Sequence, residues 1–332
     1  MPKETSRTAT IRNAVQRRIL LLDGAMGTMI QSLGPGEAIF RGSRFARHDK
    51  ALAGCCDVLC LTAPELISGI HSEYLDAGAD IIRANSFNAT PFSLTRYGLA
   101  DYAAEIAEAA ARIARDAADR REASHPGERH WVAGCMGPTA HSLTMAASVG
   151  ESAVTPAALE MAYMHQAEAL LRGGADVLLV ETVFDILNAK AALHGARRAI
   201  DASGRDVPLM LSATLTGSGR LLSGHTPEAL IASTESAGLW SIGFNCGFGP
   251  KGLLPHLAAL GSARMLTSCH PNAGLPDESG HYPESPMAMA EQLRPALEGG
   301  ALNIVGGCCG TTPAHIRAIA GVARGCTARR VP

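Results

Sequence analysis

The stretch VLLVETVFDILNAKAALHGARRAI, residues 177–200, contains the unit that determines the fold. Its first five residues, Val177–Glu181, are mostly apolar, as in a buried strand of a parallel sheet. The following segment, Phe184–Ile200, places its apolar residues at helical spacing. A strand followed at once by an amphipathic helix is typical of α/β proteins, because the chain has to cross over before the next parallel strand begins.

The same unit recurs from near the start of the chain to near its end. Two further segments show clear helical spacing, Tyr102–Arg120 and Pro156–Arg172. The expected strands are Ile19–Leu22, Asp80–Ala84, Trp131–Gly134, Val177–Glu181, Leu209–Ala213, Ser241–Phe244, Met265–Ser268 and Asn303–Val305. Eight such units in about 300 residues predict a single-domain (β/α)8 barrel, or TIM barrel, with its core at residues 15–325. An open doubly wound sheet is the alternative, since periodicity does not show whether a sheet closes.

Several helix starts and loops can be placed in the same way. A threonine shortly before a proline is typical of a helix N-terminus, and this combination occurs at Thr62-Ala63-Pro64, Thr155-Pro156, Thr226-Pro227 and Thr312-Pro313. Polar or Pro- and Gly-containing loops are expected at Arg121–Arg129 and Asn272–Pro286. The segment Gly34–Cys60 is too long for a simple turn, and in a barrel it would lie over the C-terminal face, where substrates bind.

The composition excludes several classes of protein. The chain has 332 residues, of which 47% are hydrophobic, enough for the core of one large domain. A net charge of −2 and an aromatic content of 4% argue against nucleic acid, whose binding sites concentrate basic and stacking side chains. No stretch reaches the roughly 20 apolar residues of a membrane span, and Met1–Arg18 lacks the apolar region of a secretion signal. The nine cysteines are therefore expected to be reduced, in a cytoplasmic protein.

Two adjacent cysteines follow the last expected strand. Residues 305–313 read VGGCCGTTP, so Cys308 and Cys309 lie at the carboxyl end of that strand, and residues 243–250, GFNCGFGP, place Cys246 after the sixth strand. The carboxyl ends of barrel strands share one rim, so the three thiolates can converge. Three sulfur ligands suit zinc and leave a position open for a substrate. The alternatives are buried core cysteines, or a strained disulfide between the two adjacent ones.

These motifs resemble those of the homocysteine S-methyltransferase family, whose zinc cysteines lie in Asn-Cys and Gly-Gly-Cys-Cys-Gly sequences. The resemblance covers nearly the whole chain and is greatest to the N-terminal homocysteine module of cobalamin-dependent methionine synthase. It is also carried by LDGAMGTMIQ (22–31), FRGSRF (40–45), GPT (137–139), ETVFD (181–185), NAK (188–190) and HPNAGLP (270–276). The family folds as a (β/α)8 barrel, in agreement with the repeating units.

The resemblance implies roles for residues that would bind the substrate. Asp23 and Glu181 would bind the ammonium group of homocysteine, and its carboxylate would be bound by the backbone N–H groups of Gly24, Ala25 and Met26. Exposed N–H groups in a Gly-rich turn form a sound anion site. From the residues alone, the Asp23-Gly24 pair is equally an ordinary turn, and Glu181 is equally an ion-pairing carboxylate.

Asn272 resembles the oxygen ligand that completes the zinc coordination when homocysteine is absent, although a loop-stabilising role is the alternative. The sequence departs from the family in two places. Arg83-Ala84 precedes Asn85 where relatives commonly have Thr before the Asn, and Cys269 stands where a small residue is usual. Cys269 would lie near the metal and is a candidate fourth thiol. The remaining cysteines have no motif around them and are interpreted as structural: Cys55, Cys56, Cys60, Cys135 and Cys326.

The resemblance implies zinc-dependent methyl transfer to homocysteine, which gives methionine. A free thiol is mostly protonated at neutral pH, and coordination to a metal keeps it as the reactive thiolate. The Asp-x-His-x-x-Gly motif of cobalamin modules does not occur in the sequence. Methylcobalamin, the expected methyl donor, would therefore be carried by a separate cobalamin- or folate-binding domain or subunit.

The alternative methyl donors are betaine and S-methylmethionine. A quaternary ammonium is normally held in an aromatic cage. The only tryptophans are Trp131 and Trp240, and the segment Gly34–Cys60 adds only Phe40 and Phe45, so the sequence gives little support for such a cage. An alternative of a different class is a non-catalytic zinc-binding scaffold that has kept the fold. It predicts zinc binding without methyl transfer.

Overall fold

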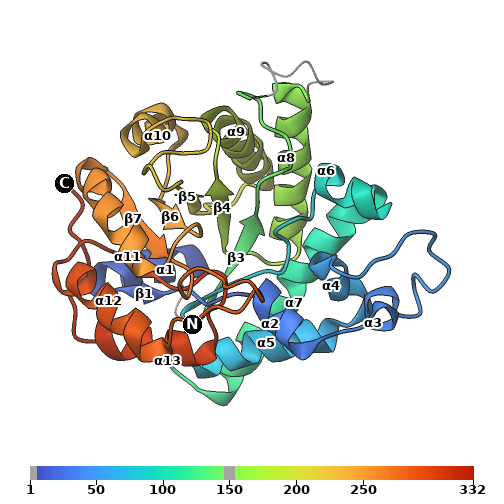
Figure 1. The fold of residues 1–332 in the computed structure, drawn as a ribbon, viewed down its shortest axis with the longest axis horizontal. Coiled ribbons are helices and arrows are strands. Elements are labelled where there is room, and N and C mark those ends of the chain that lie inside the picture. Colours follow the sequence, from blue (N-terminus) through green and yellow to red (C-terminus); the bar gives the residue numbers. More distant parts are fainter. Residues whose placement is uncertain (1–5, 146–153) are drawn as a thin grey trace.

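The computed structural model of the chain describes residues 6–145 and 154–332. In these residues eight parallel strands surround a central axis, with helices on the outside (Figure 1). The strands are β1 (Leu20–Leu21), β2 (Ile81–Arg83), β3 (Trp131–Met136), β4 (Val177–Val183), β5 (Leu209–Ala213), β6 (Ser241–Asn245), β7 (Leu266–His270) and β8 (Ile304–Val305). Their order is β1-β8-β7-β6-β5-β4-β3-β2, and a parallel bridge between Leu22 and Ile81 brings β1 beside β2. The single-domain (β/α)8 barrel is confirmed, and the open sheet is wrong.

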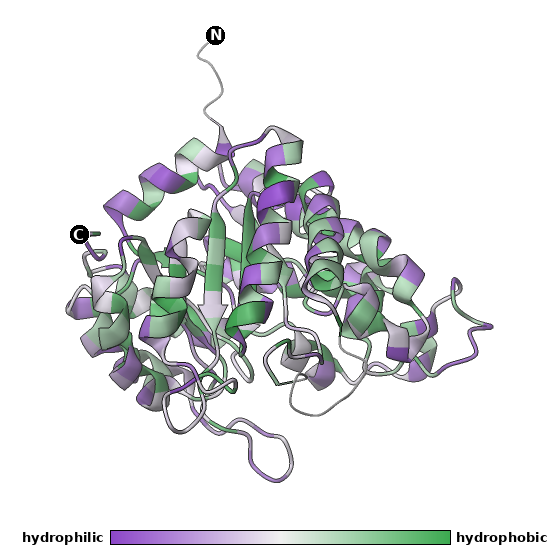
Figure 2. Cartoon of the chain, turned by 90° about the horizontal axis from the view of Figure 1, so that it is seen from above, coloured by the Kyte–Doolittle hydropathy of each residue, from purple (hydrophilic) through white to green (hydrophobic). Residues whose placement is uncertain are grey.

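The helices alternate with the strands along the chain and cover the barrel. They are α1 (Arg7–Arg17), α2 (Gly27–Leu33), α3 (Glu37–Arg41), α4 (Leu59–Thr62), α5 (Pro64–Asp76), α6 (Pro91–Leu94), α7 (Ala103–Ser124), α8 (Pro156–Arg172), α9 (Ile186–Ser203), α10 (Pro227–Thr234), α11 (Pro250–Leu253), α12 (Pro286–Glu298) and α13 (Pro313–Ala323). Short 3-10 helices lie at Cys56–Val58, Thr95–Tyr97, Ala100–Tyr102, Glu235–Ala237 and Leu254–Ser262. Hydrophobic residues gather on the strands and on the inward helix faces (Figure 2). None of the described helices is long and apolar enough to cross a membrane.

Three of the four predicted threonine caps are confirmed. The side chains of Thr155 and Thr226 accept hydrogen bonds from backbone N–H groups in the first turns of α8 and α10, and Thr312 forms a capping box with His315 at α13. Thr62 is the exception. It ends α4, where its hydroxyl donates to the carbonyl of Val58 at 3.3 Å, and α5 begins after Ala63 instead.

The structure moves some predicted boundaries. The loop expected at Arg121–Arg129 begins only after Ser124, because α7 continues through Arg121, which pairs with Asp76 of α5. The expected loop at Asn272–Pro286 is confirmed up to the start of α12. The segment Gly34–Cys60 contains α3, a short 3-10 helix and the start of α4. Most of its residues before Cys55 are exposed or half-buried, and Phe40, Phe45 and Leu52 are buried in the core.

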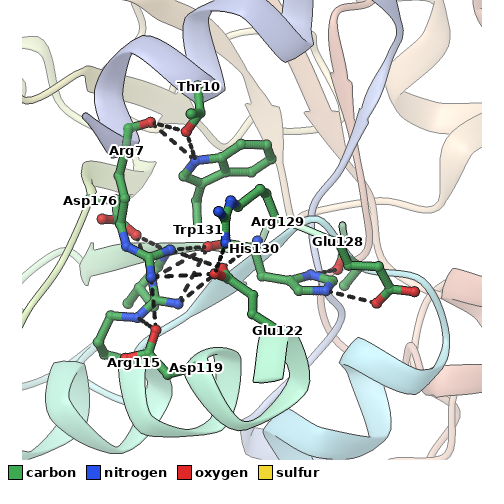
Figure 3. Close-up of polar contacts among 12 residues, drawn as sticks. Arg7, Thr10, Arg115, Asp119, Glu122, Glu128, Arg129, His130, Trp131 and Asp176 are labelled. Carbon is green, nitrogen blue, oxygen red and sulfur yellow. Dashed lines mark hydrogen bonds and ion pairs between the residues drawn. The ribbon is translucent and has the colours of Figure 1, made fainter. Parts of the chain in front are cut away.

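Helix α1 lies against the N-terminal end of the barrel. For this part of the chain, the sequence predicted only that a secretion signal is absent. That prediction concerned Met1–Arg18, of which residues 1–5 lie outside the described part of the chain. Ile11 and Val15 are buried and pack with residues of the barrel interior, including Trp131. The indole N–H of Trp131 donates to the carbonyl of Arg7 at 3.2 Å, and the Arg7 guanidinium pairs with Glu122 at 2.9 Å (Figure 3). The opposite end, at the carboxyl ends of the strands, carries Cys246, Cys308 and Cys309.

Candidate metal and thiol-binding site

The three cysteines with metal-ligand motifs converge. The Sγ atoms of Cys246, Cys308 and Cys309 all lie within 4.8 Å of one another, and that of Cys309 is 4.0 Å from each of the other two. A disulfide has an S–S distance of about 2.05 Å, so the adjacent thiols are free. With Zn–S distances of about 2.3 Å, sulfur ligands of a tetrahedral zinc lie about 3.8 Å apart. The sulfur atoms and their spacing therefore fit zinc.

The backbone around Cys246 is bent so that its thiol points to the other two. Cys246 has a φ of 59°, in the left-handed region that is uncommon for residues other than glycine. Gly247 follows with a φ of 71°, which glycine adopts without strain. Gly243, three residues earlier, lies against β7, where an added Cβ would overlap the carbonyl oxygen of Ser268. Two glycines and one strained cysteine thus position the first thiol.

Asn272 lies beside the cysteine cluster, as predicted. The side-chain oxygen of Asn272 accepts a hydrogen bond from the backbone N–H of Cys309 at 3.1 Å. The backbone N–H of Asn272 donates to the carbonyl of Phe248 at 2.9 Å. Phe248 follows Cys246 by two residues, so Asn272 joins the two loops that carry the thiols. This contact is the loop-stabilising role that the sequence allowed, and the zinc-ligand role stays a prediction.

Asp23 and Glu181 both lie buried at the mouth of the barrel, as expected, but Arg83 lies between them. The Nε of Arg83 donates to Oδ1 of Asp23 at 2.7 Å, and its backbone N–H donates to Oδ2 at 2.8 Å. Its Nη1 is 3.3 Å from Oε2 of Glu181. The sequence had identified this segment only as a departure from the family. The carboxylate pair is therefore bridged by a cation of the chain itself.

The ionisation of this group follows from burial and from Arg83. Burial raises the pKa of Asp23 to about 6, in spite of the guanidinium beside it. Burial also opposes ionisation of Glu181, but Arg83, His270 and Cys135 outweigh it and lower the pKa of Glu181 to about 2. Burial lowers the pKa of His270. At neutral pH both carboxylates are charged and His270 is neutral, so Arg83 neutralises one of the two negative charges and the group keeps a net negative charge.

One of the three backbone N–H groups predicted to bind the carboxylate of the substrate already donates a hydrogen bond within the chain. The backbone N–H of Ala25 donates to Oγ1 of Thr311 at 3.1 Å, while the hydroxyl of Tyr74 donates to the carbonyls of Ala25 and Thr311 at 2.8 and 3.0 Å. In the described part of the chain the N–H groups of Gly24 and Met26 have no hydrogen-bond acceptor. Two of the three predicted N–H groups thus have no partner among the described residues, and Gly24 itself is buried against Thr311 and Tyr74.

Two residues of the site, Cys135 and Asn245, were given no role at the site from the sequence. Cys135, interpreted as structural, donates through Sγ to Oε1 of Glu181 at 2.5 Å. The Asn245 side chain accepts from the N–H of Thr182 at 3.0 Å and donates to its hydroxyl at 2.8 Å, and Thr182 has a φ of 59°. Asn245 belongs to the Asn-Cys motif, so its position next to Cys246 was the available clue. The partners of Cys135 become apparent only in the folded barrel.

The other predicted features lie away from the three thiols. Cys269 is fully buried in β7 and is not one of the three clustered cysteines in the described chain. Cys60 donates to the carbonyl of Asn85 at 3.4 Å. The aromatic rings considered for a cage are all buried: Phe40, Phe45, Trp131 and Trp240. These four side chains are therefore used in packing.

Comparison with known proteins agrees with this geometry. The family model described as homocysteine S-methyltransferase matches residues 20–323. The homocysteine methyltransferase MmuM from Escherichia coli, in its oxidized form, is similar with 25% sequence identity and a TM-score of 0.72, over 91% of this chain and 95% of that one. Its metallated form has the same fold, with 24% identity and a TM-score of 0.72 over 93% and 98% of the two chains. The matched range contains every strand of the barrel and the three clustered cysteines, and the chain belongs to the homocysteine S-methyltransferase family.

Proposed function

We propose that this protein transfers a methyl group to the sulfur of a small thiol, with zinc held by Cys246, Cys308 and Cys309. Homocysteine is the acceptor that family membership favours, and methionine is then the product. The observation that carries the proposal is the convergence of three free thiols within 4.8 Å at the carboxyl ends of the strands. Active sites of this fold lie at that end of the barrel. The barrel core, residues 15–325, would act as one thiol-binding domain in the cytoplasm.

The reaction needs a deprotonated acceptor sulfur. When bound, zinc would supply Lewis acidity that keeps this sulfur as a thiolate at neutral pH. A sulfur lone pair forms the new S–C bond, the bond between donor and methyl breaks, and its electron pair stays with the donor. The thiol proton leaves to solvent.

The chain's own residues orient the acceptor. Asn272 would complete the metal coordination before the acceptor binds. Its hydrogen bond to the N–H of Cys309 supports a position beside the thiols. The N–H groups of Gly24, Ala25 and Met26 would bind a carboxylate of the acceptor, as backbone N–H groups in a turn bind anions; those of Gly24 and Met26 have no acceptor among the described residues. Asp23 and Glu181, which both pair with Arg83, would bind the ammonium group of homocysteine.

For the methyl donor we propose methylcobalamin carried by a separate cobalamin- or folate-binding domain or subunit. The burial of Phe40, Phe45, Trp131 and Trp240 supports this choice, because it leaves these rings unavailable for a quaternary ammonium. A stand-alone enzyme that uses S-methylmethionine or betaine is the second candidate. It is favoured by the match to 95% of the length of MmuM.

The test is a methyl-transfer assay with the purified, zinc-loaded protein. Homocysteine and a panel of small thiols are offered with methylcobalamin, S-methylmethionine or betaine, and the thioethers are quantified by mass spectrometry. Cys308→Ala should abolish transfer, while Cys326→Ala, outside the cluster, should retain it. Transfer only from an onium compound would replace the proposed donor. Bound zinc without transfer from any donor, including a methylcobalamin-loaded partner protein, would favour the scaffold.

A further inference from the structure

The loop between β7 and α12 places a tyrosine beside the three clustered thiols. This loop, residues 271–285, is joined to the cysteine-bearing turn by the backbone N–H of Ala273, which donates to the carbonyl of Cys309 at 2.9 Å. The ring of Tyr282 lies directly on Gly310, where an added Cβ would overlap the Cγ of the ring. Gly310 follows Cys309 in the chain and has a φ of 77°, so glycine both allows this turn and leaves room for the ring.

The end of the loop that carries Tyr282 is held in place. The carbonyl oxygen of Glu284 lies 2.9 Å from Nε2 of His315 in α13, and the Glu284 carboxylate accepts a hydrogen bond from the side chain of Gln292 in α12. The backbone N–H of Glu284 donates to the carbonyl of Ala273 at 3.2 Å. The two ends of the loop are therefore joined, and Tyr282 lies two residues from the anchoring Glu284.

The hydroxyl of Tyr282 is a hydrogen-bond donor for Cys309. The Tyr282 ring is partly buried and packs against the core. Its hydroxyl interacts with the thiol of Cys309, and the thiols of Cys246 and Cys308 are close by. Burial raises the pKa of Tyr282, and the three thiols raise it further. The hydroxyl is therefore protonated at neutral pH, and a thiolate at Cys309 accepts its hydrogen bond.

The other two clustered cysteines each have a donor of their own. The side-chain nitrogen of Asn245 lies 3.9 Å from Sγ of Cys308, and the backbone N–H of Gly247 is a hydrogen-bond donor to the thiol of Cys246. Each of the three sulfurs that would hold zinc thus has an N–H or O–H group of the chain beside it. A sulfur that enters from solution as the methyl acceptor does not have one of these donors.

In the proposed function, three cysteine thiolates and the acceptor thiolate lie around one metal, and each of them can attack a methyl group. A hydrogen bond to a thiolate stabilises the charged form and lowers its basicity, and the nucleophilicity of a thiolate falls with its basicity. We infer that Tyr282 protects Cys309 from methylation, so that the methyl group passes to the acceptor sulfur. This inference rests on the proposed function. Without the hydroxyl, a lone pair of the Cys309 sulfur would form the S–C bond, and the donor would keep the electron pair of the broken bond.

The test is methylation of the zinc-loaded chain by methyl iodide in the absence of an acceptor thiol. Peptide mass spectrometry gives separate rates of S-methylation at Cys246, Cys308 and Cys309. Tyr282→Phe removes the hydroxyl and keeps the ring that packs on Gly310. We expect it to raise the rate at Cys309 about fivefold relative to the other two cysteines, as the loss of one hydrogen bond would do.

The cobalt-substituted chain gives a second readout that does not depend on methylation. In Tyr282→Phe the sulfur-to-cobalt absorption band should move to longer wavelength, because a thiolate without the hydrogen bond gives up charge to the metal more readily. Tyr97→Phe is the matched control, since it removes a hydroxyl that pairs with Arg96 at the surface. It should change neither the band nor the three methylation rates.

Equal relative methylation of Cys309 in wild type and in Tyr282→Phe, with zinc still bound, would overturn the inference and leave the proposed function standing. Loss of zinc from Tyr282→Phe would also overturn it, because Tyr282 would then hold the cysteine in place rather than protect it. A wild-type chain that binds no zinc would instead remove the proposed function, and the inference would fail with it.

Discussion

The Sγ atom of Cys309 lies 4.0 Å from that of Cys246, although the two residues are 63 positions apart in the sequence. Two strands and their loops have to be placed correctly for this distance to arise. Cys309 also makes a backbone hydrogen bond to Asn272, which joins the two loops. The distance is close to the separation of about 3.8 Å between sulfur ligands of a tetrahedral zinc.

Loss of one thiol should therefore abolish tight metal binding. Cys309→Ser replaces a soft sulfur ligand by a hydroxyl, and we expect bound zinc, measured by plasma mass spectrometry after dialysis, to fall from about one per chain to below about a fifth. Cys326→Ser is the control, because the Cys326 thiol bonds to the carbonyl of Val322 outside the cluster. Unchanged zinc content in Cys309→Ser would show that the three cysteines are not the ligands.

The hydroxyl of Tyr74 should contribute to stability through the loops after β1 and β8. It donates to the buried carbonyls of Ala25 and Thr311, and Tyr74→Phe leaves both without this donor. We expect the free energy of unfolding, measured in urea, to fall by about 1–3 kcal/mol. Tyr97→Phe removes the hydroxyl that accepts from Arg96 at the surface, and its effect should stay within about 0.5 kcal/mol. Equal effects of the two variants would contradict the buried role.

Gly243 should be intolerant of any side chain. A Cβ at this position would overlap the carbonyl oxygen of Ser268 in the neighbouring strand, so Gly243→Ala should destabilise the fold by about 2 kcal/mol or more. Gly321→Ala is the matched control. Gly321 is exposed in α13 with no atom near the new methyl group, and alanine should stabilise that helix by about 0.5–1 kcal/mol. Thermal unfolding of both variants measures the difference, and a neutral Gly243→Ala would contradict the close approach of β6 and β7.

His71 should make the protein less stable in mild acid. Its ring is fully buried in α5, without a hydrogen-bond partner among the described residues, and burial lowers its pKa to about 4. Because the folded pKa is below the unfolded value of about 6.5, the unfolded chain binds the proton first. The contribution of the neutral His71 ring to the free energy of unfolding is complete above about pH 6.5. As the pH falls towards 4, the free energy of unfolding decreases by about 3 kcal/mol.

The substitution His71→Phe removes this group while keeping a ring. The difference in unfolding free energy between wild type and variant, measured in urea across this pH window, should change in favour of the variant as the pH falls. A difference that is independent of pH would show that His71 is not buried as a neutral ring.

The sequence by itself determined the eight strands, the main helices and the cysteine motifs. These features depend on local patterns: apolar runs such as Val177–Glu181, helical spacing as in Pro156–Arg172, and glycines that flank Cys308 and Cys309. The centre of each strand was predicted correctly even where the observed ends differ from the predicted ones. The apolar side chains of the strand itself form the pattern that identifies its centre. The three thiols were placed on one rim for the same reason, since each follows a strand.

Only the tertiary structure decided how these parts meet. Three contacts join residues about 60 or more positions apart. Leu22 and Ile81 form the bridge that closes the barrel, and α1 packs against Trp131. Arg83 lies between Asp23 and Glu181. In the sequence Arg83 is one residue at the end of an apolar strand, with no pattern around it. Its role depends on two carboxylates from other strands, and electrostatic partners of that kind are set by distance in space rather than by local periodicity.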